Sequence, residues 1–264
     1  MKKIRFLILK EWSEIFRNKF VLFSVAFLPL IFTILPLAIL YGMTSSGDMG
    51  SLAGMEESFS QATQLCGNLV GGECAQYLIV TQFIMLFMML PAIIPITVAS
   101  YSIVGEKTTR TLEPILATPI TTMELLAGKG LAAVIPAVAA TWVGYTLYAV
   151  GAALMNVAPA VVVKLFDPLW LLAVVVVGPL LAIAGVSIAV MISSRTSDPR
   201  VAEQISGLFI LPLVGIFIGQ STGVLLIDQT LILWAAAVLL VLDGAFLAFA
   251  VQLFQRETIL TRWK

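Results

Sequence analysis

The fold is decided by residues 77–129, where a long apolar run is followed by a charged segment. Residues 77–100 read YLIVTQFIMLFMMLPAIIPITVAS, and residues 105–129 read GEKTTRTLEPILATPITTMELLAGK. The first stretch exceeds the roughly 20 residues that an α-helix needs to cross the hydrocarbon core of a bilayer. The second carries too many charges to lie in hydrocarbon. We therefore predict that residues 105–129, called the 105–129 segment below, protrude from the membrane and dock onto a soluble partner.

The composition extends this membrane assignment to the whole chain of 264 residues. Hydrophobic residues make up 60% of it and charged residues 11%, whereas soluble domains contain about 25% charged residues. We predict an all-α fold in which residues 1–264 form one polytopic membrane domain. The formal net charge is zero and the chain shows no nucleic-acid-binding motif, so we expect no nucleic-acid partner. The chain also has no histidine, which removes the commonest general base and metal ligand.

Six apolar stretches have the length of a membrane helix. They are residues 20–42, 77–100, 130–155, 168–192, 205–227 and 230–254. With six spans, both termini and the loop 101–129 lie on one side of the membrane. That side carries every one of the 15 Lys and Arg residues except Lys164. Because Lys and Arg are enriched in cytoplasmic loops, we predict a multi-pass protein of the cell membrane with both termini in the cytoplasm.

Residues 1–19 have the pattern of an amphipathic helix that lies in the headgroup plane and precedes the six spans. At about 100° per residue, one arc of the helix is apolar and the other is mostly charged. The apolar arc consists of Ile4, Ile8, Leu9, Trp12, Ile15 and Phe16. We expect Trp12 to be the interfacial anchor and Glu11, on the other arc, to face water. The alternative is an ordinary basic flank that only sets the orientation of the first span.

Two cysteines, Cys66 and Cys74, lie in the first outer loop, residues 43–76. A disulfide bond between them is expected if this loop faces an oxidising compartment. The alternative is a pair of free thiols. Two cysteines without histidine fall short of the four ligands of a usual zinc site, so we predict no metal.

Asp243 is the one ionisable residue placed deep in a predicted span. A charged side chain at this depth costs about 2.5–3.5 kcal/mol on the insertion scale, so such residues face protein or water and mark functional positions. Asp243 is therefore our candidate for the substrate or ion pathway. The alternative is a structural role, in which a protonated Asp243 hydrogen-bonds a neighbouring helix.

The 105–129 segment contains two local patterns. Residues 121–124 read TTME, a capping box in which Thr121 caps a helix that begins near residue 122 while Glu124 reaches back. Before it, Leu112, Ile115 and Leu116 present an apolar face. An exposed apolar face on a short helix needs a groove on a partner. The alternative is that these residues rest on the protein's own membrane helices.

Residues 105–107 (GEK), followed by residues 111–120 (TLEPILATPI), resemble the GEK/E…GTLE-LL-TPV element of ABC type-2 permeases. These permeases are the membrane subunits of ATP-binding cassette exporters, including the drug-resistance and NatB-like types. The six spans, the basic N-terminal helix, the loop after the second span and the short tail also match. The sequence departs from the family at Arg110, where the family usually has glycine.

The resemblance implies that the 105–129 segment forms a coupling helix seated in a groove on an ATPase subunit. The residues that would couple to the ATPase are Glu106, Arg110, Leu112, Glu113, Leu116 and Glu124. It also implies two cytoplasmic ATPase subunits, which hold ATP and Mg, and a second permease that makes a homodimer or a related heterodimer. This chain has no GxxxxGK[ST] phosphate loop, so we expect it to bind no cofactor and to have no catalytic site of its own.

Two other functions compete with an exporter subunit that is surrounded by membrane lipid. An intramembrane enzyme needs a catalytic constellation, and the sequence has no histidine, paired intramembrane aspartates or Gly-x-Ser-Gly motif. An ATP-independent channel or membrane scaffold is the second alternative, although a channel needs a polar lining and polar residues within the spans are sparse. Co-purification of an ATPase separates the exporter from both. The apolar spans favour a lipid or hydrophobic drug as substrate, and Asp243 leaves sodium or a proton open.

Overall fold

The computed structural model describes residues 2–45, 66, 69, 71–109, 111, 120–155, 157–225 and 227–253. Within these ranges every regular element is helical. The elements of the first half are α1 (Lys2–Ile15), α2 (Lys19–Ser45), α4 (Gly72–Phe87), α5 (Leu90–Thr108) and α7 (Thr122–Leu154). The second half contains α8 (Pro159–Leu165), α9 (Pro168–Leu172), η3 (Ala173–Val177), α10 (Gly178–Ser193), α11 (Pro199–Gly207), η4 (Leu208–Ile210), α12 (Leu211–Ser221) and α13 (Gln229–Leu253).

The described residues contain six helical stretches that are long and apolar enough to cross a membrane. They are Val21–Thr44, Gly72–Thr108, Thr122–Leu154, Pro159–Ser193, Pro199–Ser221 and Gln229–Gln252. The prediction of an all-α, six-span membrane protein with an additional N-terminal helix is confirmed.

Several helices begin or end outside the predicted spans. The second stretch runs to Thr108 rather than to residue 100, because Glu106 and Lys107 near its end find polar partners inside the protein. The fifth starts at Pro199 rather than at residue 205. There the Asp198 side chain caps the helix by accepting a hydrogen bond of 2.8 Å from the backbone N–H of Arg200, and Pro199 occupies a first-turn position where its missing N–H costs nothing.

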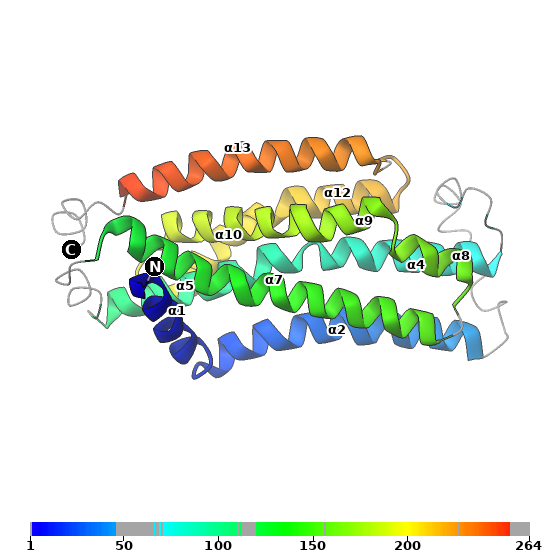
Figure 1. Ribbon diagram of the computed structural model, residues 1–264, viewed down its shortest axis with the longest axis horizontal. Helices are drawn as coiled ribbons and strands as arrows, with labels where there is room; N and C mark the ends of the chain where they lie inside the picture. Colours follow the sequence, from blue (N-terminus) through cyan, green and yellow to red (C-terminus); the bar gives the residue numbers. More distant parts are fainter. Residues whose placement is uncertain are drawn as a thin grey trace.

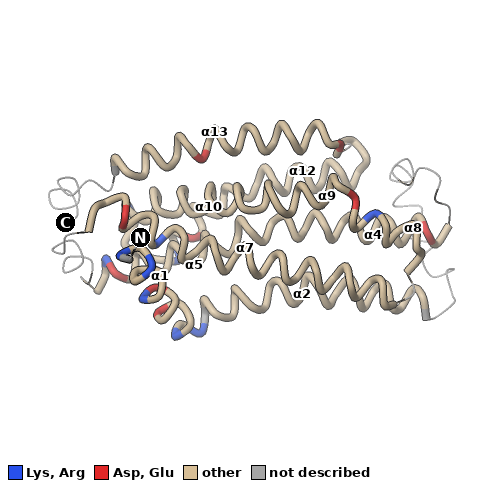
Figure 2. The backbone as a smooth tube through the Cα atoms, viewed as in Figure 1, with Lys and Arg blue, Asp and Glu red and all other residues tan. Residues whose placement is uncertain are grey.

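The long helices lie side by side along one axis, and α1 is set across them near one end (Figure 1). We call this end the α1 end and the opposite one the α8 end. The last turn of α5, the first turn of α7 and the end of α13 also lie at the α1 end (Figure 1). Charged residues gather at the two ends of the bundle, while α13 carries one acidic residue, Asp243, far from both of its ends (Figure 2).

The core of the bundle is built around α5, which packs against α10, α7 and α11. Gly185 of α10 lies so close to α5 that a Cβ there would come within 3.1 Å of the Ala92 carbonyl oxygen. The rings of Phe87 and Tyr148, both buried, stack with their centroids 5.6 Å apart. The outer helices instead expose apolar side chains such as Trp234, which is 68% exposed. Exposed apolar faces on long apolar helices are what a lipid environment requires.

Candidate functional site

A group of buried charged residues joins three helices at the α1 end. Glu11 of α1, Glu106 of α5 and Lys129 of α7 are 1%, 4% and 5% exposed. The Lys129 Nζ atom lies 2.8 Å from Glu11 Oε1 and 2.7 Å from Glu106 Oε2. Lys10 of α1 forms an ion pair with Glu106 Oε1. We call these four residues, together with Ser102 of α5, the ion cluster.

Ion pairs and hydrogen bonds hold the ion cluster together. Lys129 donates hydrogen bonds to Glu11 Oε1 at 2.8 Å and to Ser102 Oγ at 3.0 Å, whereas its contact with Glu106 Oε2 is an ion pair without hydrogen-bond geometry. Ser102 in turn donates to Glu11 Oε2 at 2.5 Å. Buried charges are tolerated only when they are paired and hydrogen-bonded in this way. The ion cluster therefore fixes the relative positions of α1, α5 and α7.

The two ion-cluster residues on α1 have shifted pKa values. Burial alone would raise the pKa of Glu11, but the charge and hydrogen bond of Lys129, the Ser102 hydrogen bond and the charge of Lys10 outweigh it and lower the pKa below its ordinary value. Burial would lower the pKa of Lys10, but its hydrogen bond to Glu106 and the charges of Glu106 and Glu11 raise it instead. Both side chains are therefore charged at neutral pH.

Lys129 reaches the ion cluster because α7 begins where the sequence predicts. The backbone N–H of Glu124 donates to Thr121 Oγ1 at 3.2 Å, and Glu124 Oε2 accepts from the backbone N–H of Thr121 at 2.9 Å. The predicted capping box is thus confirmed, and α7 starts at Thr122. Glu124 also lies 3.7 Å from the ammonium group of Lys3 on α1, which adds a second, partly exposed link between α1 and α7.

The end of α5 has a further partner on another side of the bundle. Lys107 donates hydrogen bonds of 3.2 Å to the backbone carbonyls of Ser194 and Thr196, which lie in the turn between α10 and α11. Consecutive residues of α5 thus reach different elements, because Glu106 contacts α1 and α7 while Lys107 contacts the α10–α11 turn. The start of the 105–129 segment is therefore connected to both halves of the chain.

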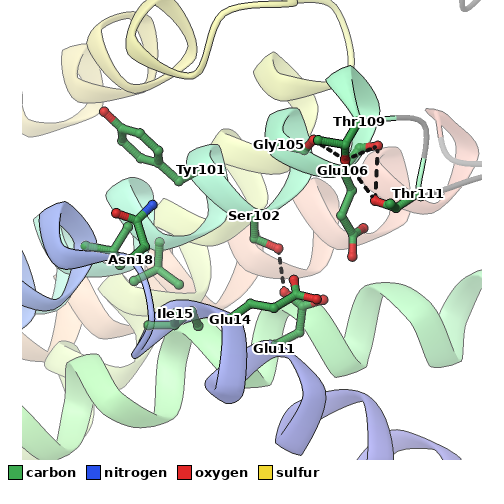
Figure 3. Close-up of a pocket in the computed structure, with 12 residues that line it drawn as sticks. Glu11, Glu14, Ile15, Asn18, Tyr101, Ser102, Gly105, Glu106, Thr109 and Thr111 are labelled. Carbon is green, nitrogen blue, oxygen red and sulfur yellow. Dashed lines mark hydrogen bonds between the residues drawn. The ribbon is translucent and has the colours of Figure 1, made fainter.

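A cleft of about 340 Å³ opens beside the ion cluster, between α1 and α5. Glu106 points toward Glu11 and Glu14 in this cleft (Figure 3). One carboxylate oxygen from each of the three lies within 4.8 Å of the others, a spacing that a metal ion could use. Lys10 lies 3.2 Å from Glu14, and the pairs with Lys10 and Lys129 already balance Glu11 and Glu106. We therefore assign the three carboxylates to the ion cluster and its surroundings rather than to a metal site.

The predicted ATPase-coupling residues divide into two groups. Arg110, Leu112, Glu113 and Leu116 lie outside the described residues, and their role stays a prediction. Glu106 and Glu124 are described, and their side chains contact this chain: Glu106 is buried in the ion cluster and Glu124 forms the cap of α7. Their geometry favours an indirect role, in which they hold the two ends of the 105–129 segment in place.

The orientation of α1 differs from the prediction. Leu7, Glu11 and Ile15, spaced four residues apart, are 3%, 1% and 7% exposed and face the bundle. The placement of Glu11 on a water-facing arc is therefore wrong, because an ion pair with Lys129 offsets its burial. The Trp12 indole N–H donates to the Ala132 carbonyl of α7 at 3.0 Å, so Trp12 anchors α1 to the bundle itself.

Asp243 is 5% exposed on α13, which packs mainly against α10. Among the described residues, neither of its carboxylate oxygens has a hydrogen-bond partner. The structural alternative required such a partner on a neighbouring helix, and the described part of the chain does not supply one. The pathway role of Asp243 stays a prediction.

Cys66 and Cys74 form a disulfide bond, with their Cα atoms 5.4 Å apart. The bond lies at the start of α4, where both cysteines pack with Leu78 and next to Leu69 and Tyr77. It fixes the first turn of α4 to the chain that precedes it. The disulfide lies far from the ion cluster, because α4 begins toward the α8 end (Figure 1).

These features define a class: a multi-pass α-helical membrane protein in which a buried ion cluster joins α1, α5 and α7 at the two ends of the 105–129 segment. A family model described as ABC-2 family transporter protein matches residues 5–233. The chain therefore belongs to the ABC-2 transporter family and is a permease, the membrane component of an ABC transporter. Permeases of this family generally work with ATPase subunits and a second permease. A search of curated proteins found no match.

Proposed function

We propose that this chain is the permease subunit of an ATP-driven exporter, which moves its substrate outward with ATP hydrolysed by separate cytoplasmic ATPase subunits. One observation carries the proposal: the Glu106–Lys129 ion pair of 2.7 Å closes the base of the segment between α5 and α7. A force applied to that segment is then delivered to α5, α7 and α1 together, because buried paired charges resist separation. A loosely tethered loop would absorb the same force.

The distribution of charge supports a cytoplasmic position for the 105–129 segment. The end of α5, the start of α7 and the end of α13 lie with α1 at the α1 end (Figure 1). In the sequence, the Lys and Arg residues are concentrated in the segments that lead to this end, whereas Lys164 of α8 lies at the opposite end. The preference of Lys and Arg for the cytoplasmic side supports the proposal that the α1 end and both termini are cytoplasmic and that the protein lies in the cell membrane.

The proposal assigns the energy source to the partners. Two ATPase subunits bind ATP and Mg and receive the 105–129 segments of two permeases, which form a homodimer or a related heterodimer. Arg110, Leu112, Glu113 and Leu116 make the contacts with the ATPase, while Glu106 and Glu124 hold the ends of the segment. Lys107 extends the coupling to the α10–α11 turn.

The substrate route is proposed to include Asp243. Its carboxylate is buried among membrane helices without a hydrogen-bond partner in the described part of the chain, and unpartnered ionisable groups at such depth are costly to keep without a function. The apolar helices favour a lipid-like or hydrophobic substrate, with a cation as the alternative cargo.

Co-expression with candidate ATPases tests the proposal. The permease should co-purify with one of them, and ATP hydrolysis by the complex in liposomes should rise when a transported compound is present. Lys129→Met should reduce this stimulation, and Lys164→Met at the α8 end should not. A permease that moves substrate without any ATPase would instead support the channel alternative.

A further inference from the structure

The helix α1 has an apolar surface that the bundle does not cover. Leu7, Glu11 and Ile15 face the bundle, whereas Phe6, Leu9 and Phe16 are 71%, 53% and 54% exposed. Backbone hydrogen bonds from Phe16 to Trp12 (2.9 Å) and from Asn18 to Glu14 (3.2 Å) continue the helical pattern beyond Ile15. The exposed residues therefore share a surface with a helical period.

Basic residues border this surface on both sides. At about 100° per residue, Leu9 and Phe16 point in nearly the same direction, and Phe6 lies about 60° from Leu9 around the helix axis. Arg5 comes next to Phe16 on one edge, and Arg17 comes next to Phe6 on the other. We call Arg5, Phe6, Leu9, Phe16 and Arg17 the outer face of α1.

The positive charge of the outer face is not balanced within the described part of the chain. Arg5 and Arg17 are exposed and make no ion pair with a described residue. The acidic residues of α1 are engaged elsewhere, because Glu11 pairs with Lys129 and Glu14 with Lys10. The outer face thus combines three large apolar side chains with two uncompensated guanidinium groups.

α1 lies next to the start of the first candidate span. α1 lies across the bundle at one end (Figure 1), and the first candidate span begins at Val21, a few residues after α1 ends. An amphipathic helix that crosses the end of a membrane bundle immediately before a span is positioned to lie at the level of the lipid headgroups. Apolar side chains there enter the acyl region while arginines reach back to the phosphates.

We propose that the outer face of α1 binds acidic lipids of the adjoining leaflet, with Phe6, Leu9 and Phe16 among the acyl chains and Arg5 and Arg17 on the headgroups. Uncompensated arginines favour an anionic headgroup, whereas a zwitterionic headgroup presents a cation beside its phosphate. Because Lys10 and Glu11 on the same helix hold Glu106 and Lys129, lipid bound on one side of α1 steadies the ion cluster on the other. The lipid contact does not depend on the proposed ATPase partner.

The test uses the full chain with a bimane fluorophore attached to Leu9→Cys. The native cysteines are joined in a disulfide, so a maleimide reagent labels only the added thiol. The protein is reconstituted in phosphatidylcholine liposomes that contain an equal small fraction of either brominated phosphatidylglycerol or brominated phosphatidylcholine. We expect stronger quenching by the brominated phosphatidylglycerol, and a preference that falls about fivefold for each arginine removed in Arg5→Gln and Arg17→Gln. Added salt should also weaken it.

Two controls separate specific binding from general contact with lipid. The same fluorophore at Leu240→Cys, a 63% exposed position within α13, should be quenched equally by both brominated lipids. The variant Arg5→Lys/Arg17→Lys should keep the preference, since the charge is retained. Equal quenching at Leu9 by the two lipids would overturn the proposal, as would a preference that survives the double glutamine change. Weak quenching of the Leu9→Cys label by both brominated lipids would also overturn the proposal, because it would indicate that a protein covers the outer face.

Discussion

Lys129 and Glu106 lie at the two ends of the 105–129 segment, and the Lys129 Nζ atom is 2.7 Å from Glu106 Oε2. The pair is buried, with side-chain exposures of 3% and 5%, and Glu11 brings α1 into the same cluster at 2.8 Å from Lys129. The ion cluster therefore joins α1, α5 and α7 at the two ends of the 105–129 segment. In the proposed exporter, this arrangement delivers a push from the ATPase to three helices at one end of the bundle.

Removing the ammonium group of Lys129 should destabilise the protein strongly. Lys129→Met leaves Glu11 and Glu106 buried with too little positive charge, and breaking a buried pair from one side costs about 3–5 kcal/mol. We expect a clear fall in the thermal unfolding midpoint of the detergent-solubilised protein. Adding Glu11→Gln should recover part of the loss.

Lys164→Met is the matched control for that experiment. The Lys164–Asp167 pair of 3.8 Å has side-chain exposures of 49% and 37%, and exposed pairs contribute at most about 1 kcal/mol. An unfolding midpoint that falls equally in the two lysine variants would contradict the assigned role of the ion cluster.

The cap of α7 should matter locally. Thr121→Ala removes the hydroxyl that accepts from the backbone of Glu124, and loss of such a cap costs about 1 kcal/mol. Hydrogen exchange should become faster at residues 122–125. Thr146→Ala removes an exposed hydroxyl that only bonds the Trp142 carbonyl within the same helix, and it should leave exchange at residues 122–125 unchanged.

The docking of α1 should be lost in acid. The pKa of Glu11 in the folded protein lies below its ordinary value of 4.5, so the unfolded state takes up protons first. The stabilisation by Glu11 is complete above that value and falls as the pH drops through the lowered pKa. Leu7 lies on the face of α1 that is buried against the bundle, so maleimide labelling of Leu7→Cys should rise as the pH is brought from about 7 to about 3, after correction for the intrinsic reactivity of a free thiol.

Two glutamate variants distinguish Glu11 from its neighbours in this pH experiment. Glu11→Gln should show high labelling of Leu7→Cys already at neutral pH and little further change in acid. Glu14→Gln, whose carboxylate is 52% exposed, should keep the acid-dependent rise. A rise that is the same with and without Glu11 would assign the acid sensitivity to another group.

The sequence predicted the long helices and the α7 cap because these depend on local patterns. Apolar length identifies a span, and Thr121 and Glu124 are close enough along the chain to identify a capping box. The ion cluster was missed because its members are far apart in sequence. A helical wheel assigns a charged residue such as Glu11 to water, although its spacing of four residues from both Leu7 and Ile15 was a signal for the buried face.

Substitutions at Asp243 should impair transport without lowering the stability of the protein. Because its carboxylate oxygens have no hydrogen-bond partner in the described part of the chain, Asp243→Leu should leave stability unchanged or raise it, by up to about 3 kcal/mol. Both Asp243→Leu and Asp243→Asn should impair transport in liposomes while assembly with the ATPase persists. Full transport by either variant would remove Asp243 from the pathway.

Photo-crosslinking from the 105–129 segment to the co-purified ATPase tests the central claim most directly. A benzoylphenylalanine in place of Leu116 should crosslink to the ATPase, whereas the same group in place of Leu154, which is 78% exposed at the far end of α7, should not. An ATPase that co-purifies but crosslinks from neither position, or only from Leu154, would contradict the account.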